Sequence, residues 1–123
     1  MATKVLVIDD AVHIRRLIIR MLEQDNYVTI QAGNGREGLQ ILEQEMPDVV
    51  TCDISMPVLD GYQFLMAARQ NPETQHIPIV IVTALGHEGE INKATELGAD
   101  ACLTKPFSSS HLREVVAKVL NNK

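Results

Sequence analysis

The sequence lacks the features that mark several large classes of protein. Its 123 residues carry a formal net charge of −5 and no basic stripe, which argues against nucleic acid as a direct ligand because nothing would neutralise the phosphates. No apolar run approaches the roughly 20 residues that a membrane span needs. The first residues lead directly into an apolar segment without a secretory signal pattern. We therefore expect a cytoplasmic protein that contacts neither membranes nor nucleic acid directly.

Cysteine and histidine are also scarce, and neither shows the spacing of a metal or disulfide site. The two cysteines, Cys52 and Cys102, each lie inside an apolar segment, where a small, reduced core side chain is the simplest interpretation. The four histidines are scattered along the chain, without the short intervals that zinc sites use. A disulfide framework and a zinc centre are both disfavoured.

What the sequence does contain is a regular alternation of apolar runs and helical periodicity. Strands are predicted at 4–8, 27–32, 49–52, 77–82 and 99–103, and each is followed by a helical pattern. Several runs are apolar throughout, as in strands buried on both faces of a parallel sheet. Five strands alternating with five helices predict an α/β fold with helices on both faces. We expect one domain over residues 1–123, with no output domain.

The stretch around Asp53 indicates how the third strand ends. The apolar run to Cys52 stops at this acid, and Pro57 and then Asp60-Gly61 follow soon after. Proline cannot continue a central strand, and Asp-Gly suits the turn that begins the next helix. Asp53 is therefore predicted to lie on a rigid element at the mouth of a loop, where reactive groups are usefully placed.

Polar side chains interrupt the apolar pattern at four predicted strand ends. Asp9 and Asp10 follow the first strand, Asp53 the third, Thr83 the fourth and Lys105 the fifth. Ligands of open α/β sheets bind at the carboxyl ends of the strands, so we expect these residues to share one crevice. Three carboxylates there would repel one another without compensating positive charge. Lys105 supplies one unit, and the remainder indicates a hard divalent cation, most simply Mg²⁺.

A carboxylate beside a cation and a lysine is a credible nucleophile toward phosphorus and can form an aspartyl phosphate. Such a transfer depends on in-line positioning and on neutralising the phosphoryl oxygens. The metal, Lys105 and the Thr83 hydroxyl would provide both. The residues at the strand ends therefore predict phosphoryl transfer to Asp53.

Several short segments at these strand ends occur together in one known family. They are Val7-Ile8-Asp9-Asp10, Asp53-Ile54-Ser55-Met56-Pro57 with Asp60-Gly61, Val82-Thr83-Ala84, Leu97-Gly98-Ala99-Asp100 and Lys105-Pro106-Phe107. Each segment alone is weak, but together and in this order the chain resembles the receiver domain of bacterial two-component response regulators, and the single-domain chemotaxis-type regulators in particular. The resemblance covers essentially the whole chain. It implies a flavodoxin-like, doubly wound (βα)₅ fold with the parallel strand order 2-1-3-4-5.

The resemblance also implies a role for each residue. Asp53 would accept a phosphoryl group from a histidine kinase or a histidine phosphotransfer protein, and Thr83 and Lys105 would contact the phosphoryl oxygens. The Lys105–Pro106 bond is expected to be cis. Mg²⁺ would be bound by Asp9, Asp10, Asp53 and the backbone carbonyl of Ser55. Phosphorylation would then shift the surface formed by the fourth helix, fifth strand and fifth helix, where a downstream protein binds or a weak dimer forms.

One departure from the family pattern concerns the switch. Cys102 lies three residues before Lys105, where receivers usually carry an aromatic ring that swings inward when the threonine engages the phosphoryl group. A small thiol cannot fill and vacate a pocket as a ring does. The sequence therefore suggests signalling through backbone motion of the segment 83–90 and the fourth helix.

A second departure concerns the lifetime of the phosphorylated state. Ser55 and Leu85 lie two residues beyond Asp53 and Thr83, where the family controls access of the hydrolytic water. Leu85 has no group that could orient this water. We expect a protein that is not a metabolic enzyme, catalyses its own Mg²⁺-dependent phosphorylation and dephosphorylates itself slowly.

Other functions fit the residues less well. A haloacid-dehalogenase-like phosphatase needs a second acid two residues after its nucleophile, where Ser55 stands. A flavodoxin-like flavin carrier needs a phosphate-binding loop after the first strand, where Asp9 and Asp10 would repel phosphate. A phosphorylation-independent docking receiver remains the main alternative, although none of the five key groups is missing. Two origins also remain open: a stand-alone regulator, or a receiver cut from a longer protein.

Overall fold

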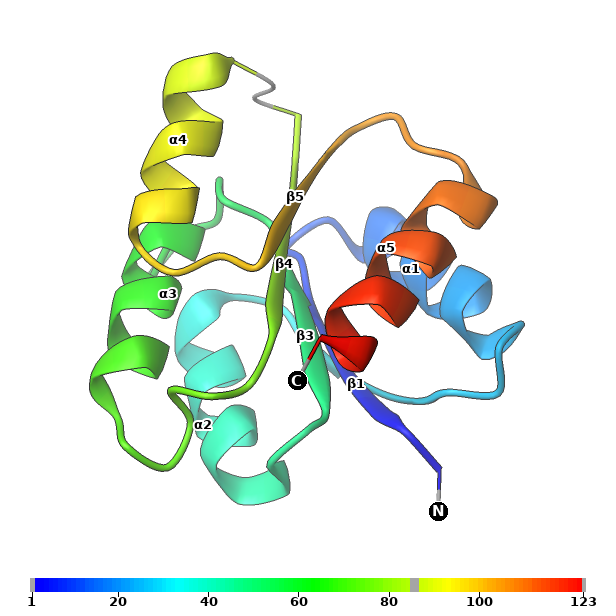
Figure 1. Ribbon diagram of the computed structural model, residues 1–123, viewed down its shortest axis with the longest axis horizontal. Helices are drawn as coiled ribbons and strands as arrows, with labels where there is room; N and C mark the ends of the chain where they lie inside the picture. Colours follow the sequence, from blue (N-terminus) through cyan, green and yellow to red (C-terminus); the bar gives the residue numbers. More distant parts are fainter. Residues whose placement is uncertain (1, 85–86, 123) are drawn as a thin grey trace.

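Strands and helices alternate along the chain (Figure 1). The computed structural model describes residues 2–84 and 87–122. The strands are β1 (Lys4–Ile8), β2 (Val28–Ala32), β3 (Val49–Cys52), β4 (Ile79–Thr83) and β5 (Ala101–Thr104). The helices are α1 (Val12–Glu23), α2 (Gly35–Glu45), α3 (Gly61–Gln70), α4 (Glu88–Glu96) and α5 (Ser109–Asn121). This order confirms the predicted alternation.

The strands form one parallel sheet in the order β2-β1-β3-β4-β5. Helices α1 and α5 lie on one face of the sheet, and α2, α3 and α4 cover the other (Figure 1). This confirms the flavodoxin-like, doubly wound arrangement and the strand order that the family resemblance implies. The direction of strand addition reverses between β1 and β3, and the carboxyl ends of two such neighbours border the crevice where this type of sheet binds ligands.

Side chains of the central strands alternate between two hydrophobic layers. Val5 and Val7 belong to the layer beneath α1 and α5, whereas Leu6 and Ile8 belong to the layer beneath α2, α3 and α4. Both layers are shielded from solvent, which is why these strands are apolar throughout rather than alternating. The largest buried side chain is Phe64 of α3. Burial on both faces holds the strand ends, and hence the site, on a rigid support.

Three strands begin later than predicted: β2 by one residue, at Val28, and β4 and β5 by two residues each. β4 begins at Ile79 because Pro78 has no N–H to donate to the neighbouring strand, although its carbonyl accepts a hydrogen bond from the backbone N–H of Val50. β5 begins at Ala101 because the preceding residue, Asp100, uses its carboxylate to accept a hydrogen bond from the N–H of Ile79. The predicted starts at 77 and 99 are therefore wrong by two residues.

Side-chain caps fix where α2, α3 and α5 begin. Asn34 and Ser108 each accept a hydrogen bond from the backbone N–H three residues later. Asp60 and Gln63 form a reciprocal capping box at the start of α3, an arrangement that satisfies two N–H groups that the helix itself leaves unpaired. This last cap matters for the site because α3 follows the loop that leaves Asp53.

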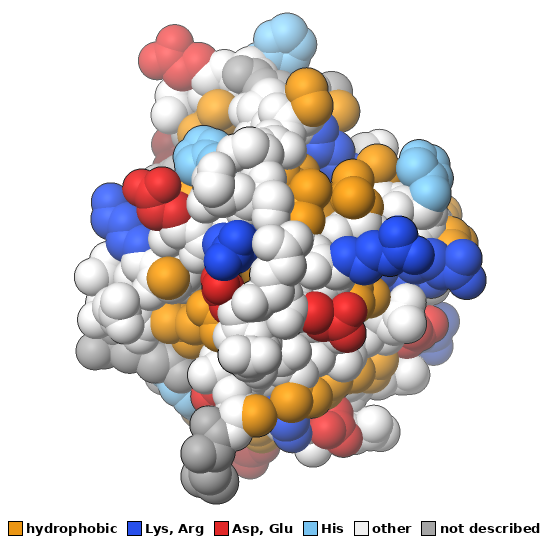
Figure 2. All heavy atoms as spheres, turned by 90° about the vertical axis from the view of Figure 1, so that its right-hand side faces the viewer, with side chains coloured by type: hydrophobic (Ala, Val, Ile, Leu, Met, Phe, Trp, Pro, Cys, Tyr) orange, Lys and Arg blue, Asp and Glu red, His pale blue; other side chains and the backbone are white. Residues whose placement is uncertain are grey.

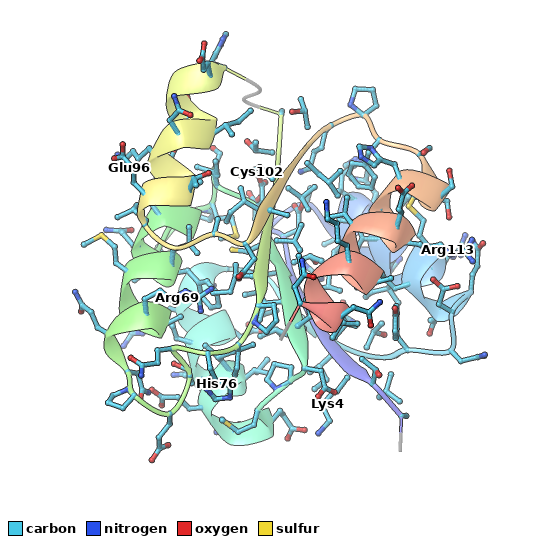
Figure 3. The ribbon with its side chains drawn as sticks, in the orientation of Figure 1. Lys4, Arg69, His76, Glu96, Cys102 and Arg113 are labelled. Carbon is cyan, nitrogen blue, oxygen red and sulfur yellow. The ribbon has the colours of Figure 1, made fainter. Side chains whose placement is uncertain are left out.

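Arg69, at the end of α3, joins several segments at the amino edge of the sheet, opposite the crevice (Figure 3). Its guanidinium donates to the backbone carbonyls of Gly98, Gln75 and Ile77 and to the carboxylate of Asp100, at distances between 2.8 and 3.1 Å. Only a planar group with five donors can serve these acceptors together. Arg69 therefore fastens the segments that lead into β4 and β5.

We expect Arg69→Lys to destabilise the protein almost as much as Arg69→Met, by about 2 kcal/mol or more. A single ammonium cannot reach all four acceptors, and each lost charge-assisted bond in a partly buried setting is costly. Urea denaturation measures the difference. Arg36→Lys, at an exposed position of α2, is the matched control and should lie within about 0.5 kcal/mol of wild type. A wild-type midpoint for Arg69→Lys would contradict this account.

Candidate functional site

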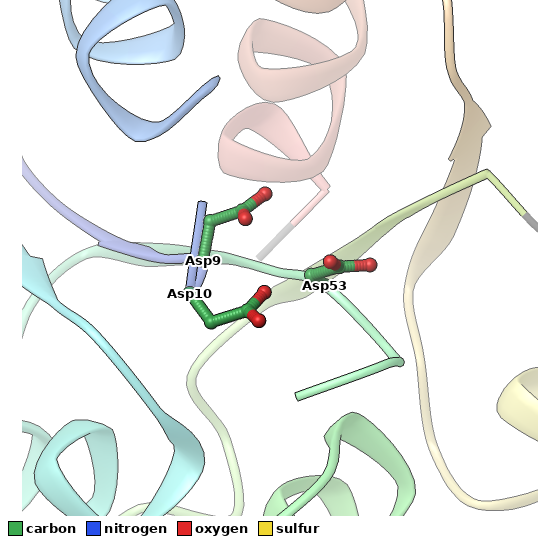
Figure 4. A group of neighbouring side chains, drawn as sticks. All are labelled: Asp9, Asp10 and Asp53. Atoms are coloured by element: carbon green, nitrogen blue, oxygen red, sulfur yellow. The ribbon is translucent and has the colours of Figure 1, made fainter. Parts of the chain in front are cut away.

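Three carboxylates meet at the carboxyl ends of β1 and β3 (Figure 4). Ile8 and Cys52, the last residues of these strands, are paired in the sheet, so the residues that follow them emerge side by side. Asp9, Asp10 and Asp53 each place a carboxylate oxygen within 4.8 Å of those of the other two. Asp9 and Asp53 are buried, whereas Asp10 is exposed. The crevice therefore holds one solvent-facing acid and two that are shielded from water.

Lys105 provides positive charge at the centre of this group. Its Nζ lies 3.0 Å from Oδ2 of Asp9 and 3.4 Å from Oδ2 of Asp53. The Lys105–Pro106 bond is cis, as the resemblance implies, and the Lys105 N–H donates to the carbonyl of Thr83 at 2.8 Å. Lys105 therefore comes from the end of β5 to contact acids on β1 and β3, bridging two strands that are not its neighbours.

Burial sets the protonation behaviour of Asp53. Loss of solvent raises the pKa of this carboxyl, as does the nearby charge of Asp9, while the ammonium of Lys105 opposes them. A folded state with a raised carboxyl pKa binds more protons than the unfolded state, so stability falls as the pH rises through that range. Any positive charge added beside Asp53 would therefore favour the ionised form of this carboxyl.

The backbone around Asp53 is tightly held. The N–H of Asp53 donates to the carbonyl of Ile8 at 3.1 Å, and the N–H of Gly61 donates to the carbonyl of Ile54 at 2.8 Å. The Cys52 thiol donates to the carbonyl of Asp53 at 3.2 Å. Burial raises the pKa of Cys52 well above its usual range, so the thiol stays protonated and acts only as a donor.

The remaining predicted residues lie at the same edge of the sheet. Thr83 is buried at the end of β4. Ser55 is exposed in the loop that follows Asp53. Leu85, on which the prediction of slow dephosphorylation rests, lies outside the described residues. The structure thus brings Asp9, Asp10 and Asp53 together with Lys105 and places Thr83 and Ser55 on the same rim.

The donor set of the crevice suits a hard cation. Its three carboxylates supply oxygen ligands, which hard divalent cations prefer, and one lysine leaves a negative balance among the charged groups. No histidine or cysteine joins this acidic group among the residues that the structure describes. The residues present therefore fit a divalent cation held by oxygen.

Cys102 lies in β5, beside Ile81 of β4, and packs against the layer beneath α2, α3 and α4 (Figure 3). An aromatic ring reaches the same region from α3: the Tyr62 hydroxyl donates to the carbonyl of Glu90 at 3.3 Å, and Lys93 Nζ lies 4.3 Å from the ring centroid. The sequence pattern does not predict this contact of Tyr62, since an isolated aromatic residue carries no signal of its own. It links α3, which follows the Asp53 loop, to α4.

The face of the molecule formed by α1 and α5 carries basic and apolar side chains together. Helix α1 exposes Arg16 and Arg20 beside Val12 and Leu17, which are 48% and 46% exposed. Figure 2 shows Lys and Arg side chains gathered on one side of this face, next to hydrophobic ones. Helix α1 is therefore locally positive, although the net charge of the whole chain is −5.

A doubly wound sheet with three acids and a lysine at the carboxyl ends of its strands is the architecture of a signalling receiver domain. The chain belongs to the response regulator receiver domain family, whose family model matches residues 5–117. Phosphorylation-activated switching in two-component systems and phosphorelays is the function of this family, whose members interact with histidine kinases or phosphotransfer proteins.

The chain is similar to curated relatives of two lengths. It is 36% identical over 120 residues to sporulation initiation phosphotransferase F of Bacillus subtilis, covering 98% of this chain and 95% of that protein. Chemotaxis protein CheY of Halobacterium salinarum is 32% identical over 120 residues, with 98% of each chain covered. "Probable transcriptional regulator ycf27" of Guillardia theta is 40% identical over 117 residues, which are 95% of this chain but 45% of that protein. The chain thus spans about half the length of the ycf27 regulators.

Solved structures show the same fold. The chemotaxis response regulator CheY4 of Vibrio cholerae has a TM-score of 0.91 at 29% identity, covering 97% of this chain and 99% of that one. The receiver domain of the Francisella response regulator 1452 has a TM-score of 0.90 at 32% identity, covering 98% of each. Within residues 2–84 and 87–122, no helix has the length and apolar character that crossing a membrane requires.

Proposed function

We propose that this receiver accepts a phosphoryl group on Asp53 from a histidine kinase or a histidine phosphotransfer protein. The observation that carries the proposal is the contact of one lysine with two of three clustered carboxylates at the switch point of the sheet. Thr83 and Lys105 contact the phosphoryl oxygens in this proposal. Mg²⁺ would be held by Asp9, Asp10, Asp53 and the backbone carbonyl of Ser55.

The chemistry assigns a task to each group. A carboxylate oxygen of Asp53 attacks the phosphorus of a phosphohistidine, the new O–P bond forms as the P–N bond breaks, and the imidazole leaves with the bonding electron pair. Lys105 already contacts Asp53, so its ammonium is placed to neutralise charge on a phosphoryl oxygen attached there. When bound, Mg²⁺ would add positive charge next to the phosphoryl oxygens. Burial of Asp9 and Asp53 excludes water that would weaken these interactions.

The output of the switch is a change in the surface of α4, β5 and α5, which binds a downstream protein or forms a weak dimer. The protein acts in the cytoplasm, without contacting DNA itself. The contact of Tyr62 with the carbonyl of Glu90 supports a route to this surface, because it connects the helix after the Asp53 loop to α4. Residues 1–123 form a single receiver domain in this proposal.

The Cys102 position tests how the signal travels. If backbone motion of the segment 83–90 and α4 carries it, Cys102→Ala should leave the affinity of the phosphorylated protein for its partner within about twofold of wild type, since a small side chain is replaced by a smaller one. Calorimetric titration of both forms with the partner measures this. A large loss confined to the phosphorylated form would show that the thiol itself takes part.

Slow autodephosphorylation is part of the same proposal. Leu85 offers no polar group that could orient a hydrolytic water toward a phosphoryl group on Asp53. The phosphorylated state should therefore outlast the signal that produces it. A phosphorylation-independent docking module remains the second candidate function, favoured only if Asp53 proves unreactive.

Mass spectrometry of the intact protein after incubation with acetyl phosphate and Mg²⁺ tests the proposal. Wild type should gain about 80 Da, the mass of one phosphoryl group, and the gain should disappear when EDTA is added beforehand. Asp53→Asn should show no gain while remaining folded. An equal gain in Asp53→Asn would place the chemistry elsewhere, and no gain in a folded wild type that binds Mg²⁺ would favour a kinase-specific receiver or the docking module.

A further inference from the structure

We propose that Arg15 is a positioning residue for Asp9 and Asp10, and that the affinity of the site for Mg²⁺ depends on it. The inference rests on the proposed function, since it concerns the metal site of that reaction. Arg15 lies on α1, outside the acidic group, and its side chain contacts none of the three carboxylates in the described hydrogen bonds. Its contribution would therefore be made through the backbone.

The contacts of Arg15 converge on the end of β1. Nη1 donates to the backbone carbonyl of Asp9 at 2.7 Å, and Nε donates to Oε1 of Gln31 at 2.8 Å. Gln31 lies in β2, directly beside Val7 of β1. One guanidinium thus connects the first turns of α1, the edge strand and the peptide bond that joins Asp9 to Asp10. The planar guanidinium, which donates from two nitrogens at fixed positions, suits these two acceptors better than the flexible ammonium of a lysine.

Arg15 completes the restraint of Asp9. The N–H of Asp9 donates to the carbonyl of Ala32 at 3.2 Å, Oδ1 accepts from the N–H of Ala11 at 2.9 Å, and Oδ2 accepts from Lys105 at 3.0 Å. With the carbonyl held by Arg15, every polar group of Asp9 has a partner. The Asp9–Asp10 peptide plane is then fixed, and this plane sets the direction in which the exposed Asp10 side chain leaves the backbone.

Charge and geometry predict opposite results when Arg15 is removed. If only charge mattered, loss of a cation near three carboxylates would make the site more negative and strengthen Mg²⁺ binding. If Arg15 positions the acids, its loss would weaken binding, because groups that orient metal ligands typically contribute 10- to 100-fold to metal affinity. The sign of the change therefore separates the two roles.

The test is calorimetric titration of the folded protein with MgCl₂. A second titration uses Mn²⁺, whose binding is detected by electron paramagnetic resonance. Arg15→Met should weaken binding about tenfold or more. Arg16→Met is the matched control, because it removes the same charge from the next, exposed position of α1; its affinity should be unchanged or slightly higher. Arg15→Lys, which can still donate to the Asp9 carbonyl, should recover part of the loss.

Arg15→Met binding as tightly as wild type, or more tightly, would overturn the inference, as would an equal loss in Arg16→Met. If Arg15→Met does not fold, Gln31→Leu provides the test, because it keeps the charge of Arg15 but removes one hydrogen-bond partner of its guanidinium. Gln31→Leu should weaken Mg²⁺ binding several-fold, and an unchanged Mg²⁺ affinity would overturn the inference. A wild type that binds no Mg²⁺ would instead overturn the proposed metal site, and this inference with it.

Discussion

Lys105→Met is expected to slow phosphorylation by acetyl phosphate by about 100-fold, the typical effect of removing one preorganised donor from a developing negative charge. The same variant should bind Mg²⁺ several-fold more tightly. Lys105 lies 3.0 Å from Asp9 and 3.4 Å from Asp53, so without it the three carboxylates share one crevice with no positive side chain in contact with them among the residues that the structure describes. A cation is then attracted more strongly, while the phosphoryl oxygens lose a partner.

The pH dependence of labelling should shift in the same variant. Burial raises the pKa of Asp53 and the charge of Lys105 opposes the rise, so removing Lys105 should raise this pKa further. Because the ionised carboxylate is the nucleophile in the proposed reaction, labelling should fall as the pH drops through its pKa. The fall should therefore begin at a higher pH in Lys105→Met than in wild type.

Intact-protein mass spectrometry over a pH series measures rate and profile together. Lys118→Met, at an exposed position of α5, makes the same change in net charge far from any contact with the acids and should behave as wild type. A Lys105→Met protein with an unchanged rate, or with weaker Mg²⁺ binding, would contradict the role given to Lys105.

Gly61→Ala should destabilise the protein by about 3 kcal/mol and also slow phosphorylation. A Cβ on Gly61 would overlap the carbonyl oxygen of Asp53 and lie 2.7 Å from Cα of Ile54. Both neighbours are backbone atoms, so the clash can be relieved only by moving the end of β3 or the start of α3. Forced overpacking of this kind costs up to about 3 kcal/mol, and any shift of the Asp53 carbonyl also moves the carboxylate that we propose as the nucleophile.

Chemical denaturation and acetyl phosphate labelling of the same sample test both effects. Gly89→Ala is the matched control, because a Cβ there meets nothing within 4 Å and alanine favours a helix by roughly 0.5–1 kcal/mol over glycine. It should be as stable as wild type or more stable. A Gly61→Ala protein with wild-type stability would show that the β3–α3 loop adapts freely.

The sequence predicts the acidic crevice because each acid is marked by its own short stretch of sequence. Asp9, Asp10 and Asp53 each end or follow an apolar run, and parallel strands bring such ends to one edge of the sheet. Lys105 could be included for the same reason. The apolar pattern predicts the start of β4 too early because Pro78 is apolar but has no N–H to donate to a neighbouring strand. Apolar periodicity carries no information about hydrogen-bond donors.

Arg15, Tyr62 and Arg69 could not be assigned from the sequence for a common reason. Their partners are largely backbone carbonyls: that of Asp9 for Arg15, that of Glu90 for Tyr62 and those of several loop residues for Arg69. Every residue has a backbone carbonyl, so the residue types in the sequence do not indicate which carbonyl a long side chain will contact. Only the folded arrangement identifies these contacts.

The position of Arg69 has a consequence for how sequences with this fold can diverge. The hydrogen bonds of Arg69 lie at the amino edge of the sheet, whereas the repelling carboxylates lie at the carboxyl edge. Substitutions at the carboxyl edge of the sheet therefore leave the hydrogen bonds of Arg69 intact. New partners, or a different lifetime of the phosphorylated state, can be selected at one end of the strands while the other end keeps the chain folded.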